Sequence, residues 1–180
     1  MHKKTVFIAQ AAVIAALYTV LGSFAFIPIG PFQLRFGEAL TVLPFFTPAA
    51  IPGLFVGCIL SNVITGCSPW DIAFGSIATL LGAVGTYLLR NSKWWLASIP
   101  PIIANTVILP PIFTLVYGDG TYWFNLFTTF VGEILACGII GTLLVMLLKK
   151  YGKQINFRSK TEKHKTKEEN QEQKKEAEQE

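Results

Sequence analysis

The sequence predicts an all-α integral membrane protein, a bundle of six membrane-crossing helices with both chain ends in the cytoplasm. The first observation behind this prediction is composition: of 180 residues, 52% are hydrophobic and only 14% are charged, whereas a soluble domain has roughly 25% charged residues. The second is charge placement, because 17 charged residues lie in residues 149–180 and only seven remain in residues 5–148. Because residues 5–148 are so apolar, they form neither a soluble globular domain nor a disordered segment.

Four apolar stretches are long enough to cross a bilayer, which takes about 20 residues. They are residues 5–27, 72–89, 94–116 and 123–148. A further apolar stretch, residues 36–65, contains Pro48, Pro52 and Gly53 close together near its middle. Because helices break most easily at such clusters, we expect this stretch to form a hairpin of two short spans.

The placement of basic residues favours six spans over five. With six spans, the two chain ends and the loop containing Arg90 and Lys93 lie on one side of the membrane, together with most of the Lys and Arg residues. With five spans, the basic clusters would fall on opposite sides, against the positive-inside bias. We therefore expect a membrane domain over residues 1–150 and a charged, disordered cytoplasmic tail over residues 151–180.

Glu133 is the most informative single residue. It lies about ten residues inside the last apolar stretch, hence roughly 15 Å deep, where a carboxylate is costly unless it is paired, protonated or facing a polar cavity. Asn125, Thr129 and Cys137 share its helix face at steps of four residues. We expect Glu133 and Asn125 to line a ligand cavity; the alternative is a structural carboxylate hydrogen-bonded between helices.

Other candidates for ligand binding lie near the expected outer side and in mid-span. Gln33 and Arg35 alternate with apolar residues, so that one side of this segment is polar, and Arg35 could pair with Glu38 on a helical turn. An interfacial loop with a simple ion pair is the alternative. Asn105 lies in mid-span, where an interhelical hydrogen bond is the alternative to a cavity role, and Asp71 lies near an expected helix start.

Small residues form a face on the first span. Ala11 and Ala15 give one small-xxx-small pair, and Ala12 and Ala16 give a second. Such faces let another helix approach closely, either a helix of a partner protein or another helix of the same bundle. The pattern of Gly53, Gly57 and Ser61 is similar, and there we favour packing inside the bundle.

The sequence lacks the common motifs of catalysis and metal binding. It contains no P-loop, no HExxH, no GxSxG and no nucleophile–base pair. The three cysteines form no CxxC pair, and both histidines lie outside the apolar body, so no metal site of ordinary spacing is expected. The net charge of +4 comes from the chain ends and does not indicate nucleic-acid binding. We expect neither an enzyme nor a bound cofactor.

Two stretches resemble the signature of the QueT family. They are QLRFGEALTVLPFFTPAAIPGLFVGC at residues 33–58 and DIAFGSIATLL at residues 71–81. Members of this family are substrate-binding (S) components of energy-coupling factor (ECF) transporters and are linked with uptake of queuosine precursors. The resemblance covers residues 5–150 and excludes the tail.

The resemblance implies a six-helix S-component fold in the cell membrane. It implies docking to a transmembrane coupling protein and two ABC ATPases, which use the ATP. The alanine-xxx-alanine motif of such first helices is matched by Ala11, Ala12, Ala15 and Ala16. The implied ligand is a deazaguanine base, with Glu133 or Glu38 holding its donor edge and Asn105 or Gln33 the rest. Alternatives are another vitamin or nucleobase, a small membrane enzyme, and a structural subunit without a ligand.

Overall fold

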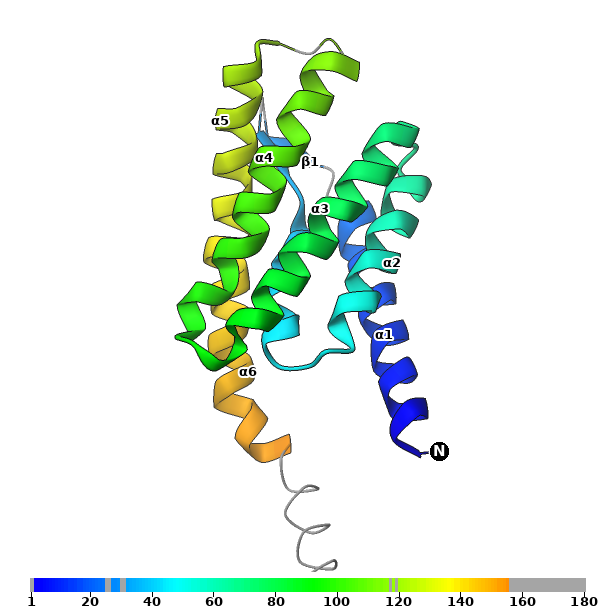
Figure 1. Ribbon diagram of the computed structural model, residues 1–180, viewed down its shortest axis with the longest axis vertical. Helices are drawn as coiled ribbons and strands as arrows, with labels where there is room; N and C mark the ends of the chain where they lie inside the picture. Colours follow the sequence, from blue (N-terminus) through cyan, green and yellow to red (C-terminus); the bar gives the residue numbers. More distant parts are fainter. Residues whose placement is uncertain (1, 25–26, 30–31, 117, 119, 156–180) are drawn as a thin grey trace, which may run out of the picture. The chain divides into compact units, whose positions relative to one another are not determined.

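The computed structural model describes residues 2–24, 27–29, 32–116, 118 and 120–155 (Figure 1). The chain divides into two compact units, residues 1–145 and 146–180. The elements in chain order are α1 (His2–Phe24), β1 (Ile27–Ile29), β2 (Phe32–Leu34), η1 (Phe36–Phe45), α2 (Ala50–Ile64), α3 (Pro69–Leu88), η2 (Leu89–Asn91), η3 (Trp94–Ser98), α4 (Ile99–Val116), α5 (Tyr122–Glu133), η4 (Ile134–Gly141) and α6 (Thr142–Ile155). In the second unit, residues 146–155 are helical, and the rest of the predicted tail lies outside the described residues.

The four long predicted spans are helical, although the helix of the first ends at Phe24 and not at residue 27. Among the described residues, four helical stretches have the length and composition to cross a membrane: Lys4–Ser23, Pro69–Asn91, Trp94–Val116 and Tyr122–Lys150. The predicted break in residues 36–65 is also confirmed, because η1 ends at Phe45 and α2 begins at Ala50. With 10 and 15 residues, neither arm alone reaches the usual length of a span.

The first unit buries polar side chains together with its apolar core, and its surface carries many large apolar side chains. Large apolar side chains such as Leu115, Ile8 and Val107 are exposed, as expected where a helix faces lipid rather than water. Its fully buried side chains include Glu38, Thr79 and Asn105. Because buried polar groups are costly without partners, their gathering in the interior marks the candidate site.

Neighbouring helices contact one another in chain order from α1 to α5 (Figure 1). The short helix η1 contacts α1, α2, α3 and η4. Residues Gly37 to Val42 of η1 are all buried. This segment therefore runs through the interior of the first unit, and it places Glu38 there.

The helices α1 and α2 pack with their backbones in close approach. A Cβ added to Gly53 would lie 2.7 Å from the Ala11 carbonyl oxygen, and one added to Gly57 would lie 2.8 Å from that of Ala15. Gly22 of α1 meets the Ser61 side chain in the same way. The internal packing predicted for the Gly53, Gly57 and Ser61 pattern is thus confirmed.

Three segments depart from the predicted all-α fold. The strands β1 and β2 form a small antiparallel hairpin in which Pro28 pairs with Gln33, on the segment whose residues alternate in polarity. The ten residues of η1 form a 3₁₀-helix and the eight of η4 a π-helix. Both are long for their kinds, and π segments inside helices often mark functional sites.

Candidate functional site

A cluster of buried polar side chains lies in the interior of the first unit, and we call it the polar centre. Its members come from six helical elements, which explains why no single stretch of sequence displays it. They are Tyr18 of α1, Glu38 of η1, Thr79 of α3, Asn105 of α4, and Glu133 and Cys137 of α5 and η4.

Glu38 is fully buried, and its first carboxylate oxygen is held by two hydroxyl groups. The Tyr18 hydroxyl donates to Oε1 at 2.5 Å, and the Thr79 hydroxyl lies 3.2 Å from the same atom. The second oxygen, Oε2, is buried and has no hydrogen-bond partner among the described residues. A buried carboxylate with one free oxygen is expensive, so Glu38 has unused capacity to accept a hydrogen bond.

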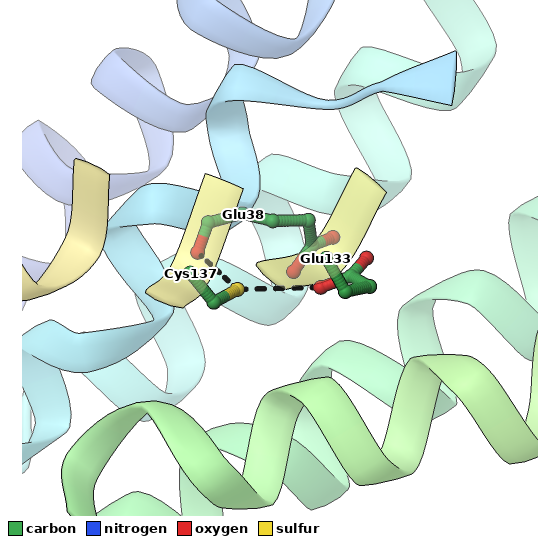
Figure 2. Close-up of side chains that lie close together, drawn as sticks. All are labelled: Glu38, Glu133 and Cys137. Atoms are coloured by element: carbon green, nitrogen blue, oxygen red, sulfur yellow. Dashed lines mark hydrogen bonds between the residues drawn. The ribbon is translucent and has the colours of Figure 1, made fainter. Parts of the chain in front are cut away.

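Glu133, the last residue of α5, lies beside Glu38 of η1. The Cys137 thiol is 3.3 Å from Glu133 Oε2 and 3.2 Å from the backbone carbonyl of Glu38, so it can donate to either (Figure 2). One oxygen of each carboxylate and the Cys137 sulfur lie within 4.8 Å of one another. Glu133 is 4% exposed, so two acids share one dry site.

Asn105 reaches the polar centre from α4. Its amide lies next to the Glu133 carboxylate, but both Nδ2 and Oδ1 are buried without a hydrogen-bond partner among the described residues. The residue is 1% exposed. Buried amides are rarely left unpaired in native proteins, and one beside a buried carboxylate indicates a site that a ligand completes.

Arg35 borders the polar centre at the start of η1. Burial opposes its charge, but Asp71, followed by Cys58 and Glu38, acts on the guanidinium and raises the pKa of Arg35. The guanidinium carbon also lies 6.0 Å from the centroid of the Phe113 ring, within reach of a cation–π contact. Among the acids, Asp71 favours the charge of Arg35 more than Glu38, which was the expected partner.

A small cavity adjoins the polar centre. It measures about 20 Å³ and is lined by residues that include Tyr18, Arg35 and Asn62. This volume admits about one water molecule, whereas small-molecule pockets usually measure roughly 300–1,000 Å³. Because the side chains of the polar centre are buried and the adjoining cavity is this small, a ligand the size of a base requires the surrounding elements to separate.

Comparison with known proteins gives the chain a family. The family model described as "QueT transporter" matches residues 8–150, which is most of the chain. The chain belongs to the QueT transporter family. A curated relative, "Queuosine precursor transporter QueT" of Lactococcus lactis subsp. cremoris (strain MG1363), is 34% identical over 82 residues, which cover 43% of this chain and 47% of the relative. The match thus spans about half the length of that relative. No solved structure matches the chain at a significant level.

Membership in the QueT transporter family confirms several predictions made from the residues. The family is one of transporters and not of enzymes. The four long apolar helices agree with a multi-pass protein of the cell membrane. The matched region contains every residue of the polar centre.

The remaining predicted site residues of this QueT-family chain, Asn125, Asp71 and Gln33, are not members of the polar centre. Asn125 is buried on the same face as Glu133, but its amide donates to Thr114 of α4 at 3.0 Å, so part of its role is packing. Asp71 is buried in the first turn of α3, and its charge favours the charged form of Arg35. Gln33 pairs through its backbone in β2, and its side chain lies outside the described residues.

The predicted small face of α1 is split between two environments. Ala15 is buried against Gly57, and Ala11 is half-buried against Gly53. Ala12 and Ala16 are exposed. One alanine pair therefore serves packing within this QueT-family chain, and the other is open to the outside.

Sequence reasoning missed Tyr18 and Thr79, which hold Glu38. A signal for Tyr18 was present, because it continues the spacing of Ala11 and Ala15 toward Gly22 along one face of the helix. No comparable signal marked Thr79, since threonine is common in membrane helices. The grouping of Glu38, Glu133 and Cys137, a set of potential metal ligands, was also missed, because these residues come from distant parts of the sequence.

Proposed function

We propose that this chain is the substrate-binding component of an ECF-type importer and captures a queuosine precursor, a deazaguanine base, from outside the cell. It delivers the base through a transmembrane coupling protein and two ABC ATPases. The chain itself holds no cofactor, and the partner subunits hydrolyse the ATP. The name of the curated relative supports the substrate class, and the family supports transport.

The observation that carries this proposal is the incomplete hydrogen bonding of the polar centre. Glu38 Oε2 and both amide atoms of Asn105 are buried and unpaired among the described residues, and Glu133 lies between them. A deazaguanine base is flat and rich in N–H donors, with a carbonyl acceptor on the same ring. Carboxylates and a carboxamide are the complementary groups.

Both chain ends are proposed to be cytoplasmic, in a bundle of six helices. The basic residues near α1, in the loop between α3 and α4, and after Leu148 support this orientation. The orientation does not depend on whether η1 and α2 cross the bilayer as two short spans or enter and leave from the outer side. Two short spans would add two crossings, and arms that enter and leave from the outer side would add none. With the four long helices the number of crossings is even in either case, so both chain ends lie on the same side.

The exposed pair Ala12 and Ala16 is proposed as the part of α1 that meets the coupling protein. Both side chains are small and exposed, so a helix of another protein can approach the backbone of α1 there. Ala11 and Ala15 are occupied by α2 and serve this purpose only by keeping α1 in place.

Ligand binding by the purified protein tests the proposal. A deazaguanine base added at 100 times its Kd stabilises the folded state by about 2.7 kcal/mol, which is measured as a rise in the thermal unfolding midpoint in detergent. Glu133→Gln is expected to fold normally and to lose high-affinity binding. Binding within a few-fold of the unsubstituted protein would place the site elsewhere. No shift with any deazaguanine base would favour a different vitamin or a subunit without a ligand.

A further inference from the structure

The charges in and around the polar centre do not balance. Glu38 and Glu133 are both buried and contribute two acids. Arg35 is the nearby cation, and Asp71 is the charge that acts on it most strongly. The other basic side chains that the structure describes in the first unit, Lys4, Arg90 and Lys93, are exposed. The closed site therefore has more acid than base, and a protonated acid or a cation must supply the difference.

The spacing of the two carboxylates fits a single cationic group. One oxygen of each lies within 4.8 Å of the other, and their side chains converge in Figure 2. A charged N–H group bonds to a carboxylate oxygen at about 2.8 Å, so one nitrogen can contact two oxygens up to about 5.6 Å apart. In the closed structure the two carboxylates can therefore share one cationic nitrogen.

We propose that Glu38 and Glu133 together bind one ammonium group of the substrate, so that this transporter selects cationic over neutral deazaguanines. The proposal rests on the proposed function, since it takes the polar centre as the substrate site. The free Oε2 of Glu38 is one acceptor and the Glu133 carboxylate is the other. Asn105, which is also unpaired among the described residues, is left to read the amide-like edge of the ring.

This assignment separates recognition of charge from recognition of the ring. An ammonium ion between two buried carboxylates removes the charge imbalance, whereas a hydroxyl in its place leaves both acids uncompensated. Two protonated acids, by contrast, would treat the two ligands alike. The preference for a cation therefore distinguishes the two ways of balancing the site.

The experiment compares two ligands of nearly equal size, 7-aminomethyl-7-deazaguanine and 7-hydroxymethyl-7-deazaguanine. Their Kd values are measured by calorimetry on the full chain in lipid nanodiscs. The aminomethyl compound is expected to bind at least about 30-fold more tightly, as for a desolvated charge pair. Glu38→Gln and Glu133→Gln should each reduce this ratio at least tenfold, mainly by weakening the aminomethyl compound.

Thr86→Val is the matched control for these substitutions. It removes a buried hydrogen bond to the Ala97 carbonyl, 2.8 Å long, two turns along α3 from Thr79, and should leave the ratio unchanged. If the unsubstituted protein binds both compounds tightly within threefold of each other, the shared ammonium site is wrong and the proposed function stands. If neither compound binds, the proposed function fails and the ammonium site fails with it. The comparison in the unsubstituted protein decides the matter even if a Gln variant does not fold.

Discussion

The hydroxyl of Tyr18 on α1 lies 2.5 Å from Oε1 of Glu38 on η1. This contact joins the first helix of the chain to the central carboxylate of the candidate site. Since the Thr79 hydroxyl also approaches the same oxygen, Oε1 is held from two helices while Oε2 remains available. The carboxylate is therefore oriented before any ligand arrives.

Tyr18→Phe is expected to weaken both folding and binding. The substitution removes a hydrogen bond to a buried carboxylate, a contact worth about 2 kcal/mol, and allows the Glu38 side chain to turn. The thermal unfolding midpoint should fall, and the affinity for a deazaguanine base should fall at least about fivefold, or 1 kcal/mol. Tyr122→Phe, at an exposed position, is the matched control. Equal behaviour of the two variants would mean that Tyr18 does not orient Glu38.

Asn105→Leu is expected to separate stability from binding. In the closed state the amide atoms of Asn105 are buried without partners among the described residues, and such a group costs about 1–3 kcal/mol. The variant should therefore unfold at the same temperature or higher, yet bind the base at least about tenfold more weakly. Thermal unfolding with and without ligand measures both effects. A variant that loses stability and keeps its affinity would show that Asn105 is a structural residue.

Gly57→Ala is expected to destabilise the bundle. The added Cβ would lie 2.8 Å from both the Ala15 carbonyl oxygen and the Tyr18 Cβ, so α1 and α2 must move apart, at a cost of about 1–3 kcal/mol. Gly138→Ala is the control, because its nearest neighbour would be 3.6 Å away. The unfolding midpoints of the two variants in detergent give the comparison. A Gly57→Ala protein as stable as the control would contradict the close packing of the two helices.

Ala16→Trp is expected to block transport without disturbing the binding site. The position is exposed on α1, so the large ring does not displace a neighbour inside the chain. Affinity of the purified protein should stay within about twofold, or 0.4 kcal/mol, while copurification with the coupling protein and cellular uptake of the base should be lost. Ile103→Trp, at an exposed position of α4, is the control. Normal uptake by the Ala16 variant would move the docking surface elsewhere.

The depth of a residue and the spacing of its neighbours could be predicted from the sequence. Glu133 stood out because a carboxylate inside an apolar stretch has few inexpensive environments, and the break between η1 and α2 followed from proline and glycine chemistry. In the structure Glu133 is buried in the interior, and η1 ends before α2 begins at Ala50. These features depend on local sequence, so local reasoning was sufficient.

The grouping of the site could not be predicted in the same way. Glu38 and Glu133 meet because η1 folds into the interior as a 3₁₀-helix and contacts η4, and tertiary packing decides both events. The two alanine pairs of α1 also have identical spacing, so sequence alone could not tell that Ala15 faces α2 while Ala16 is exposed. Sequence identified the candidates, and only packing could assign them to faces.

The π-helix η4 affects the direction in which side chains of the last helix point. Buried residues on this helix recur every four positions, at Asn125, Thr129, Glu133, Cys137, Gly141 and Val145. In a pure α-helix of 3.6 residues per turn, each such step rotates the side chain by about 40°, and five steps would turn Val145 toward the opposite side from Asn125. A π-helix has more residues per turn and rotates the other way at each step. Two of the five steps lie in this widened segment, so it offsets part of the drift and helps one helix to keep a single face toward the interior.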